Sequence, residues 1–414
     1  MQRIKLEELN HWWIQKTVDP ELALPFKREM YPEIAAALDR RFITALVGLR
    51  RVGKTTILYQ LIQHLLERKV AVENLLFFSF DETSATWGDA IQTYQEIHQK
   101  NFREEKVYIF LDEIQRQEHW EYELKKYYDL YPKLKFIISG SESLFIKKKT
   151  KENLAGRIFE YKLMPFSFKE YLQLNKIDQK YEHQVVPFFQ KFVEQGGFPE
   201  TFALSERERK EYLRSLIVDK IIYKDIPKLF QLEDPEFLGV LLELVAANPG
   251  MYVDYQSLSQ QFGKDRRVIK KYFFYLQSSF LISLLGNYRK GKAASLRKKK
   301  RAYPLDHAFC TLYHPGKEES FTGKVVETLI INALQAVSFW KNGTEIDIIH
   351  QDFPMEVKYQ EQINSADWKP LIDFMRHFER EKGFLITKNM EKAITVPEGS
   401  ITLIPAWKFV LEKV

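Results

Sequence analysis

The segment Gly48–Thr56 constrains the fold more than any other part of this 414-residue chain. It reads GLRRVGKTT and fits the pattern G-x-x-x-x-G-K-[ST]. It follows an apolar run at 42–47 and opens a helical pattern at 55–68. In that setting the loop turns its backbone N–H groups toward a phosphate chain, and the helix N-terminus adds positive potential. The sequence therefore predicts a phosphate-binding strand–loop–helix unit.

The residue types of this loop predict a nucleotide ligand. Lys54 can reach the β- and γ-phosphates of ATP, and Thr55 offers a hydroxyl to Mg²⁺. We therefore expect ATP and Mg²⁺ as cofactors. The expected cofactor-binding residues are Gly48, Arg50, Arg51, Val52, Gly53, Lys54, Thr55, Thr56 and Ser141.

A second apolar run ends in two acids. Val107–Glu113 reads VYIFLDE, which is typical of a buried strand with carboxylates at its end. We expect Asp112 to hold Mg²⁺ through water and Glu113 to polarise the attacking water. Two adjacent carboxylates can also cap the next helix, but the upstream phosphate loop favours catalysis. Lys54, Asp112 and Glu113 are thus the predicted catalytic residues of an ATP hydrolase.

Two further residues are candidates near the phosphates. Ser141 follows the apolar run at 135–139 and can contact the γ-phosphate or the attacking water. Arg157 is a candidate for reaching phosphate within its own chain or across a subunit interface. An ordinary surface arginine is an equally good interpretation of Arg157.

Apolar runs alternate with helical periodicity in the first 165 residues. Such runs indicate strands buried on both faces of a parallel sheet, and the alternation indicates an α/β layered domain. The runs are 42–47, 75–80, 107–111, 135–139 and 158–163. This domain covers residues 1–165. Later patterns predict three more parts: a helical lid over 166–247, a winged helix-turn-helix over 248–302 and an α/β domain over 303–414.

The positive charge balance of the chain resides in one short segment of the predicted winged helix. The chain has a net charge of +6, yet 289–301 alone carries eight basic and no acidic side chains. That segment falls at the wing, and the helix at 266–280 is the expected recognition helix. Lys and Arg there would contact DNA phosphates with salt-dependent affinity; a basic interface for an acidic partner is the alternative. The expected nucleic-acid contacts are Arg266, Arg267, Lys270, Lys271, Arg289, Lys290, Lys292, Arg297, Lys298, Lys299, Lys300 and Arg301.

The tail combines carboxylates with a lysine. Strand patterns at 338–340, 345–349, 355–359 and 383–387 surround a turn that would bring Asp347 beside Glu356. Such a pair can hold Mg²⁺ or Mn²⁺. Glu356 and Lys358 are two residues apart and therefore share a strand face.

Taken in order, GLRRVGKTT, IFLDEIQ, IISGSES, LAGR and MPFSFKEYL resemble the AAA+ ATPases common in archaea and bacteria. The later segments GGFPE, IIYKDI and YPLDHAF, with Asp306, match as well. The resemblance implies a sheet order of 5-1-4-3-2 and a homo-oligomer such as a hexamer.

The tail also resembles a PD-(D/E)xK nuclease core. The resemblance gives catalytic roles to Asp347, Glu356 and Lys358 and a metal-ligand role to Glu327, although no proline precedes Asp347 and Glu345 is a rival ligand. The expected metal ligands of the chain are therefore Thr55, Asp112, Glu327, Asp347 and Glu356.

Two functions fit these patterns. The first is an ATPase that acts on DNA, such as branched or repair and recombination intermediates, with a tail that binds or cleaves it. The second is a regulatory ATP-binding switch with an inactive tail. No stretch approaches 18 uncharged apolar residues, so we expect no membrane partner and a cytoplasmic location.

Overall fold

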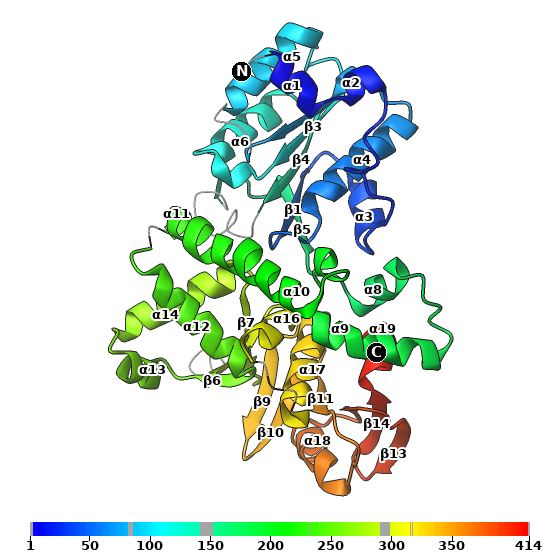
Figure 1. Ribbon diagram of the computed structural model, residues 1–414, viewed down its shortest axis with the longest axis vertical. Helices are drawn as coiled ribbons and strands as arrows, with labels where there is room; N and C mark the ends of the chain where they lie inside the picture. The colour runs from blue at the N-terminus through cyan, green and yellow to red at the C-terminus, as the bar shows by residue number, and fades with distance from the viewer. Residues whose placement is uncertain are drawn as a thin grey trace. The chain divides into compact units, whose positions relative to one another are not determined.

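The computed structural model describes residues 3–81, 86–140, 152–230, 232–289, 299–314, 316 and 318–412. Two compact units divide the chain, Met1–Met164 and Pro165–Val414 (Figure 1). The boundaries expected near 247 and 302 both fall inside the second unit. None of the described helices combines the length and the apolar character needed to cross a membrane.

The first unit is built on a five-stranded parallel sheet. Its strands are β1 (Ile43–Gly48), β2 (Leu75–Ser79), β3 (Val107–Asp112), β4 (Leu134–Gly140) and β5 (Ile158–Leu163). Their order, β2-β3-β4-β1-β5, is the predicted 5-1-4-3-2 arrangement counted from the other edge. Every residue of β1 to β4 is buried, as the near-continuous apolar runs predicted. The parallel α/β fold of this unit is therefore confirmed.

Helices cover both faces of this sheet (Figure 1). One hydrophobic cluster joins α1, α5 and α6 to one face, where it includes Val47 and Phe78. Phe77 points to the opposite face and packs against Tyr59 of α4, with ring centroids 4.8 Å apart. The helices are α1 (Arg3–Leu9), α2 (Trp12–Gln15), α3 (Tyr31–Ala36), α4 (Lys54–Glu67), α5 (Trp87–His98) and α6 (Trp120–Leu130).

The N-terminal residues cover the β2 edge of the sheet. The Asn10 side chain donates to the Phe77 carbonyl at 2.9 Å and accepts from the Phe77 N–H at 2.6 Å. The indoles of Trp12 and Trp13 both donate to the Leu75 carbonyl. An open strand edge is a template for unwanted pairing, and side chains take the place of a sixth strand here.

The second unit begins with helices, as the sequence predicted. Capping boxes at Ser167 and Ser205 begin α8 and α10. A turn at Gly196 and Gly197 ends α9, and a Cβ on Gly196 would lie 2.5 Å from an oxygen of Asp306. The elements are α8 (Phe168–Leu174), α9 (Glu182–Gln195), α10 (Glu206–Tyr212), the π-helices η6 (Leu213–Val218) and η7 (Ile221–Asp225), α11 (Ile226–Phe230) and α12 (Pro235–Ala247).

A nine-stranded mixed sheet spans the rest of the second unit, in the order β13-β14-β12-β11-β10-β9-β7-β8-β6. Strand β7 pairs antiparallel with β8 and parallel with β9, so the predicted wing and tail share one sheet. Its strands are β6 (Met251–Val253), β7 (Ile282–Asn287), β8 (Lys300–Pro304), β9 (Ser338–Asn342), β10 (Thr344–His350), β11 (Phe353–Lys358), β12 (Lys382–Thr387), β13 (Lys392–Val396) and β14 (Gly399–Pro405).

Among the described residues, six helices accompany this sheet. They are α13 (Tyr255–Phe262), α14 (Arg266–Ser278), α16 (Ala308–Tyr313), α17 (Glu319–Leu334), α18 (Ser365–Phe378) and α19 (Ala406–Glu412). The four strands expected in the tail correspond to β9 to β12. The sequence patterns did not predict β6, β13, β14 or α19.

Candidate functional site

The phosphate loop joins β1 to α4 in the conformation that its glycines permit. A Cβ on Gly48 would lie 2.2 Å from the Leu163 carbonyl oxygen of β5, so only glycine fits there. Arg51 and Gly53 both have positive φ, 64° and 93°, and Gly53 immediately precedes α4. Alternation of left- and right-handed backbone turns successive N–H groups to one side, which makes an anion-binding concavity.

The side chain of Lys54, the first residue of α4, lies against this loop. Its ammonium group donates to the carbonyls of Gly48 and Leu49, at 3.2 and 2.8 Å, and only 5% of the residue is exposed. Glu113 lies 3.8 Å from the same nitrogen. The lysine charge is therefore held at the loop, beside the acid pair, where a phosphate chain would need it.

The acid pair lies at the end of β3, where Asp112 is the last residue of the strand and Glu113 follows it. Asp112 accepts from the Thr55 hydroxyl at 2.8 Å and from the Ser139 hydroxyl of β4. Burial and the neighbouring Glu113 raise the pKa of Asp112 above its ordinary value. A cation beside the carboxylate would favour its charged form. Thr55 and Asp112 thus fit Mg²⁺ and would hold it.

Glu113 adopts a left-handed conformation with φ of 52°, which turns the chain sharply after β3. Its carboxylate accepts from Gln115 at 2.5 Å, and its N–H donates to the Ser139 hydroxyl at 3.3 Å. Ser139 thus contacts both members of the acid pair. Ser141, the residue expected from the sequence, comes two residues later and lies outside the described residues. Ser139 ends the apolar run at 135–139, and the ends of neighbouring parallel strands lie side by side. That position could have identified Ser139 as a neighbour of Asp112.

Arg28 is a site residue that the sequence patterns missed. Its guanidinium donates to the Val52 carbonyl in the phosphate loop at 2.7 Å and to the Met164 carbonyl after β5 at 2.9 Å. The residue is 93% buried, since its exposed fraction is 7%. It precedes the loop by twenty residues in a segment without periodicity, so no local pattern could have identified it.

Arg157 lies at the amino ends of the parallel strands, whereas the phosphate loop lies at their carboxyl ends. Its carbonyl accepts from the N–H of Ile43, the first residue of β1, whereas the loop follows the last. A six-residue strand spans roughly 17 Å at about 3.3 Å per residue, which is beyond the reach of an arginine side chain. Arg157 instead forms a forked ion pair with Asp129, at 2.9 and 3.1 Å. The expectation that it reaches phosphate within its own chain is therefore wrong.

The remaining loop residues differ in exposure. Val52 is fully buried, Arg50 and Thr56 are partly buried, and Arg51 is exposed. The Arg51 side chain therefore lies in solvent, and the Val52 side chain packs into the interior of the unit.

In the second unit, a tight hairpin brings the tail acids together. The register pairs Ile348 with Met355, which sets Asp347 beside Glu356, as predicted. The Asp347 N–H donates to Glu356 at 3.2 Å, and Lys358 donates to Glu356 at 2.7 Å. Burial and the negative charge of Asp347 raise the pKa of Glu356 to about 8. The shared strand face of Glu356 and Lys358 is confirmed.

Arg301 also belongs to this cluster, which corrects its predicted role. We call Glu327, Asp347 and Glu356 the acid set. Arg301 is 3% exposed, and its guanidinium contacts Asp347 at 3.1 Å and Glu327 at 2.8 Å. A buried arginine held by two carboxylates is not available to nucleic-acid phosphates. The acid set does not fit a divalent cation either, because Arg301 lies between two of its members. Among the described residues, no group of three metal-ligating side chains is placed to hold a metal ion.

The predicted recognition helix, α14, presents a basic face. Arg266, Arg267, Lys270 and Lys271 are exposed, while Ile269, Phe273 and Leu276 are buried in the expected stripe. Phe274 extends this face and is 47% exposed.

Only part of the basic segment is described. Arg289 and Lys299 are exposed, Lys299 pairs with Asp254 at 2.6 Å, and Lys300 is partly buried at the start of β8. Lys290, Lys292, Arg297 and Lys298 lie outside the described residues.

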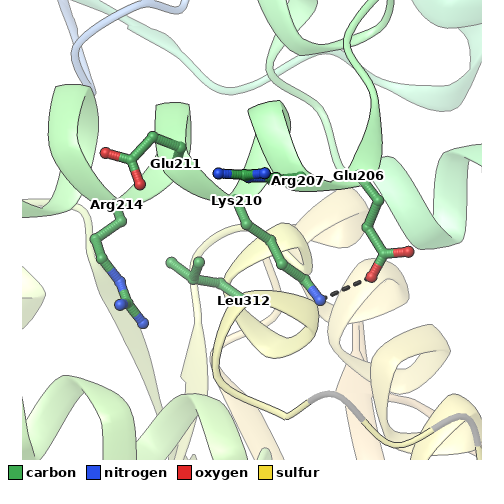
Figure 2. Close-up of a pocket in the computed structure, with 6 residues that line it drawn as sticks. All are labelled: Glu206, Arg207, Lys210, Glu211, Arg214 and Leu312. Atoms are coloured by element: carbon green, nitrogen blue, oxygen red, sulfur yellow. Dashed lines mark hydrogen bonds and ion pairs between the residues drawn. The ribbon is translucent and has the colours of Figure 1, made fainter.

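A surface depression of about 500 Å³ is lined by five charged residues of α10 and η6 and by Leu312 of α16 (Figure 2). Figure 2 shows charged side chains of both signs on α10, where Lys210 pairs with Glu206 at 2.7 Å. None of the predicted site residues lines it.

Comparison with known families agrees with this geometry. The family model of an AAA domain matches residues 40–172, which contain the phosphate loop, the acid pair and all five parallel strands. Residues 40–172 are therefore similar to AAA domains, in agreement with the parallel sheet, the phosphate loop and the acid pair. Residues 187–315 match the model of a domain of unknown function, DUF8612.

Curated relatives cover a larger part of the chain. It is 28% identical over 250 residues to an uncharacterized protein of Haemophilus influenzae, which covers 59% of this chain and 62% of the relative. It is 32% identical over 250 residues to the uncharacterized protein MJ1637 of Methanocaldococcus jannaschii, which covers 53% of this chain and 52% of the relative. The aligned region thus spans between half and two thirds of each relative.

Among solved structures, the S. cerevisiae Hsp104–ADP complex matches with a TM-score of 0.32 and 15% identity. The match covers 66% of this chain and 40% of that one. A likeness of this size adds nothing to the assignment of the fold.

Proposed function

We propose that the chain is a Mg²⁺-dependent ATP hydrolase whose nucleotide cycle acts on DNA. The convergence of Lys54, Thr55 and Asp112 at the carboxyl edge of the parallel sheet carries the first part of this proposal. Mg²⁺, when bound, polarises the terminal phosphates. Lys54 would balance phosphate charge, and Glu113 would take a proton from the attacking water.

The exposed face of α14 supports the action on DNA. Four basic side chains and Phe274 lie along one side of α14. This helix belongs to the segment from α12 to β8, whose elements follow in the order helix, strand, helix, helix, strand, strand. This order, with β6 and β7 on either side of β8, supports a winged helix. Basic residues on such a helix contact the phosphate backbone and release counterions, so binding weakens steeply with salt.

Stimulation of ATP hydrolysis by DNA tests this function. Turnover would be measured with linear, forked and four-way DNA at 50 and 200 mM salt. The variant Arg267→Gln/Lys270→Gln/Lys271→Gln should lose most of the stimulation and most of its salt dependence. Basal hydrolysis should not change, because these residues belong to the second unit and lie outside the nucleotide site.

A matched control removes three positive charges elsewhere in the second unit. Lys176, Lys180 and Lys191 are exposed on or near α8 and α9. Their triple change to Gln should leave the stimulation within about twofold of wild type. Equal losses in both triple variants would mean that net charge, not the α14 face, explains the binding. No stimulation of the wild type by any DNA would contradict the proposed action on DNA.

We also propose a homo-oligomer, such as a hexamer. Arg157 is out of reach of the phosphate loop in its own chain, so any contact with nucleotide requires a second copy. Sedimentation velocity with and without ATP tests this: a species larger than the monomer is expected with ATP, and a monomer under both conditions would contradict it.

A regulatory ATP-binding switch with an inactive tail is the second candidate. The observation that favours it is the burial of Arg301 among the tail acids. Persistent ATP binding without stimulation by DNA would support this candidate over the first.

A further inference from the structure

The guanidinium of Arg301 is the centre of a buried cluster assembled from four separate elements. It contacts Glu327 of α17 at 2.8 Å, Asp347 of β10 at 3.1 Å and Glu345 of β10 at 3.4 Å. Its Nε donates to the carbonyl of Gly250, in the turn before β6, at 2.9 Å. The side chain of Arg301 is 4% exposed and that of Glu327 is 3% exposed. The fork of donors on an arginine suits this divergent set of acceptors better than a compact ammonium would.

Every carboxylate oxygen of the acid set already has a donor. Glu327 accepts from Arg301, from the Tyr303 hydroxyl at 2.6 Å and from Lys324 at 2.6 Å. The second oxygen of Asp347 accepts from a backbone N–H of β11 at 3.1 Å. Both oxygens of Glu356 are likewise occupied, by Lys358 and by the Asp347 N–H.

The charges of the cluster agree with this arrangement. Although burial alone would raise the pKa of Asp347, the positive charges of Arg301, Lys324 and Lys358 lower it below its ordinary value. The carboxylate is therefore stabilised by cations that belong to the chain itself. A divalent metal needs several oxygens at close, nearly fixed distances, which this set supplies only if Arg301 withdraws.

Gly250 shows that the backbone is shaped around the arginine. A Cβ at this position would lie 2.6 Å from an Arg301 nitrogen and 2.9 Å from the Tyr303 hydroxyl, and its φ is +85°. The turn thus accommodates the guanidinium only because residue 250 is a glycine in a left-handed conformation.

We propose that Arg301 is the resident cation of the acid set and occupies the position that a divalent metal would require. The second unit therefore holds no divalent cation at Glu327, Asp347 and Glu356. Arg301 closes this nuclease-like site from within the chain. It also fixes the start of β8, where the basic segment 289–301 ends, to α17 and β10. This inference concerns the acid set alone and does not depend on ATP hydrolysis.

Mn²⁺ binding by the full chain, without nucleotide and followed by electron paramagnetic resonance, tests the proposal. All proteins would carry Asp112→Asn, so that the first unit contributes no Mn²⁺ site. In this background, adding Asp347→Asn should leave the amount of bound Mn²⁺ unchanged. If Asp347→Asn lowers it by one equivalent, the acid set binds metal with Arg301 in place and the proposal is overturned.

Arg301→Ala provides the complementary arm. It should create one Mn²⁺ site that Asp347→Asn then removes, and Mn²⁺ should raise the thermal midpoint of Arg301→Ala alone. A folded Arg301→Ala protein that gains no Mn²⁺ would refute the claim that the guanidinium occupies a cation position. If Arg301→Ala does not fold, the proposal is still tested by Mn²⁺ binding to the Asp112→Asn protein with and without Asp347→Asn, because both of these proteins keep Arg301.

Discussion

The buried Arg28 fork predicts that a conservative change far from the loop in sequence weakens nucleotide binding. The substitution Arg28→Lys keeps the positive charge but replaces the two-pronged donor with a compact one. Val52 and Met164 present their carbonyls at 2.7 and 2.9 Å to different nitrogens of the guanidinium. A lysine can serve only one of them well.

The magnitude follows from these contacts. An unsatisfied buried carbonyl costs roughly 1–3 kcal/mol, so Arg28→Lys should lower the free energy of unfolding of the first unit by about that amount. Because Val52 lies in the phosphate loop, part of this loss should appear in ATP affinity. A loss of about 1.4 kcal/mol corresponds to a tenfold rise in Kd.

The assay pairs fluorescent-ATP titration with urea unfolding of the full chain. Arg68→Lys is the matched control, since Arg68 forms a forked pair with Asp39 at 3.1 Å, but both side chains are about half exposed. Exposed pairs contribute at most about 1 kcal/mol, and ATP affinity should not change. If Arg28→Lys binds ATP as tightly as wild type and unfolds within about 0.5 kcal/mol of it, the role assigned to Arg28 is refuted.

Two other predictions concern the sheet of the first unit. Gly48→Ala places a Cβ against the Leu163 carbonyl, so β1 and β5 must separate; we expect a lower thermal midpoint and loss of ATP binding, and a normal midpoint with normal binding would contradict this. Burial lowers the pKa of Lys135, which donates to the Phe42 carbonyl and the Thr44 hydroxyl, to about 7. Above pH 7 the unfolded chain therefore binds one more proton than the folded chain. The free energy of unfolding of wild type, relative to that of Lys135→Met, should then rise by at most about 1.4 kcal/mol per pH unit from pH 7 to 10. Urea unfolding at several pH values measures this difference, and a difference that does not change with pH would disprove the prediction.

The sequence predicted the first unit well because its signals are local. A buried parallel strand needs a continuous apolar run, and a phosphate loop needs glycines at fixed spacing, so both β1 and Gly48 could be identified without knowledge of distant contacts. The pairing of Asp347 with Glu356 was also predictable, because a short turn fixes the register of a hairpin.

The errors have a common physical origin, namely contacts distant in sequence. Arg301 belongs to a basic segment by composition, yet its neighbours in space are the acids of α17 and β10. Arg157 precedes β5 by one residue, and only the parallel pairing with β1 reveals that it lies away from the phosphate loop. Likewise, β7 pairs with β9 and so joins the predicted wing to the tail sheet. The sequence of neither strand alone indicates this pairing.

The central claim is that the acid pair at the end of β3 serves ATP hydrolysis, and Glu113→Gln tests it most directly. This change keeps the size of a side chain that lies 3.8 Å from the Lys54 ammonium but removes its ability to accept a proton. We predict an ATP Kd within about threefold of wild type and a turnover reduced by roughly 10²–10⁴-fold, whereas the exposed control Glu118→Gln should hydrolyse normally. Unchanged turnover in Glu113→Gln, with ATP still bound, would contradict the account.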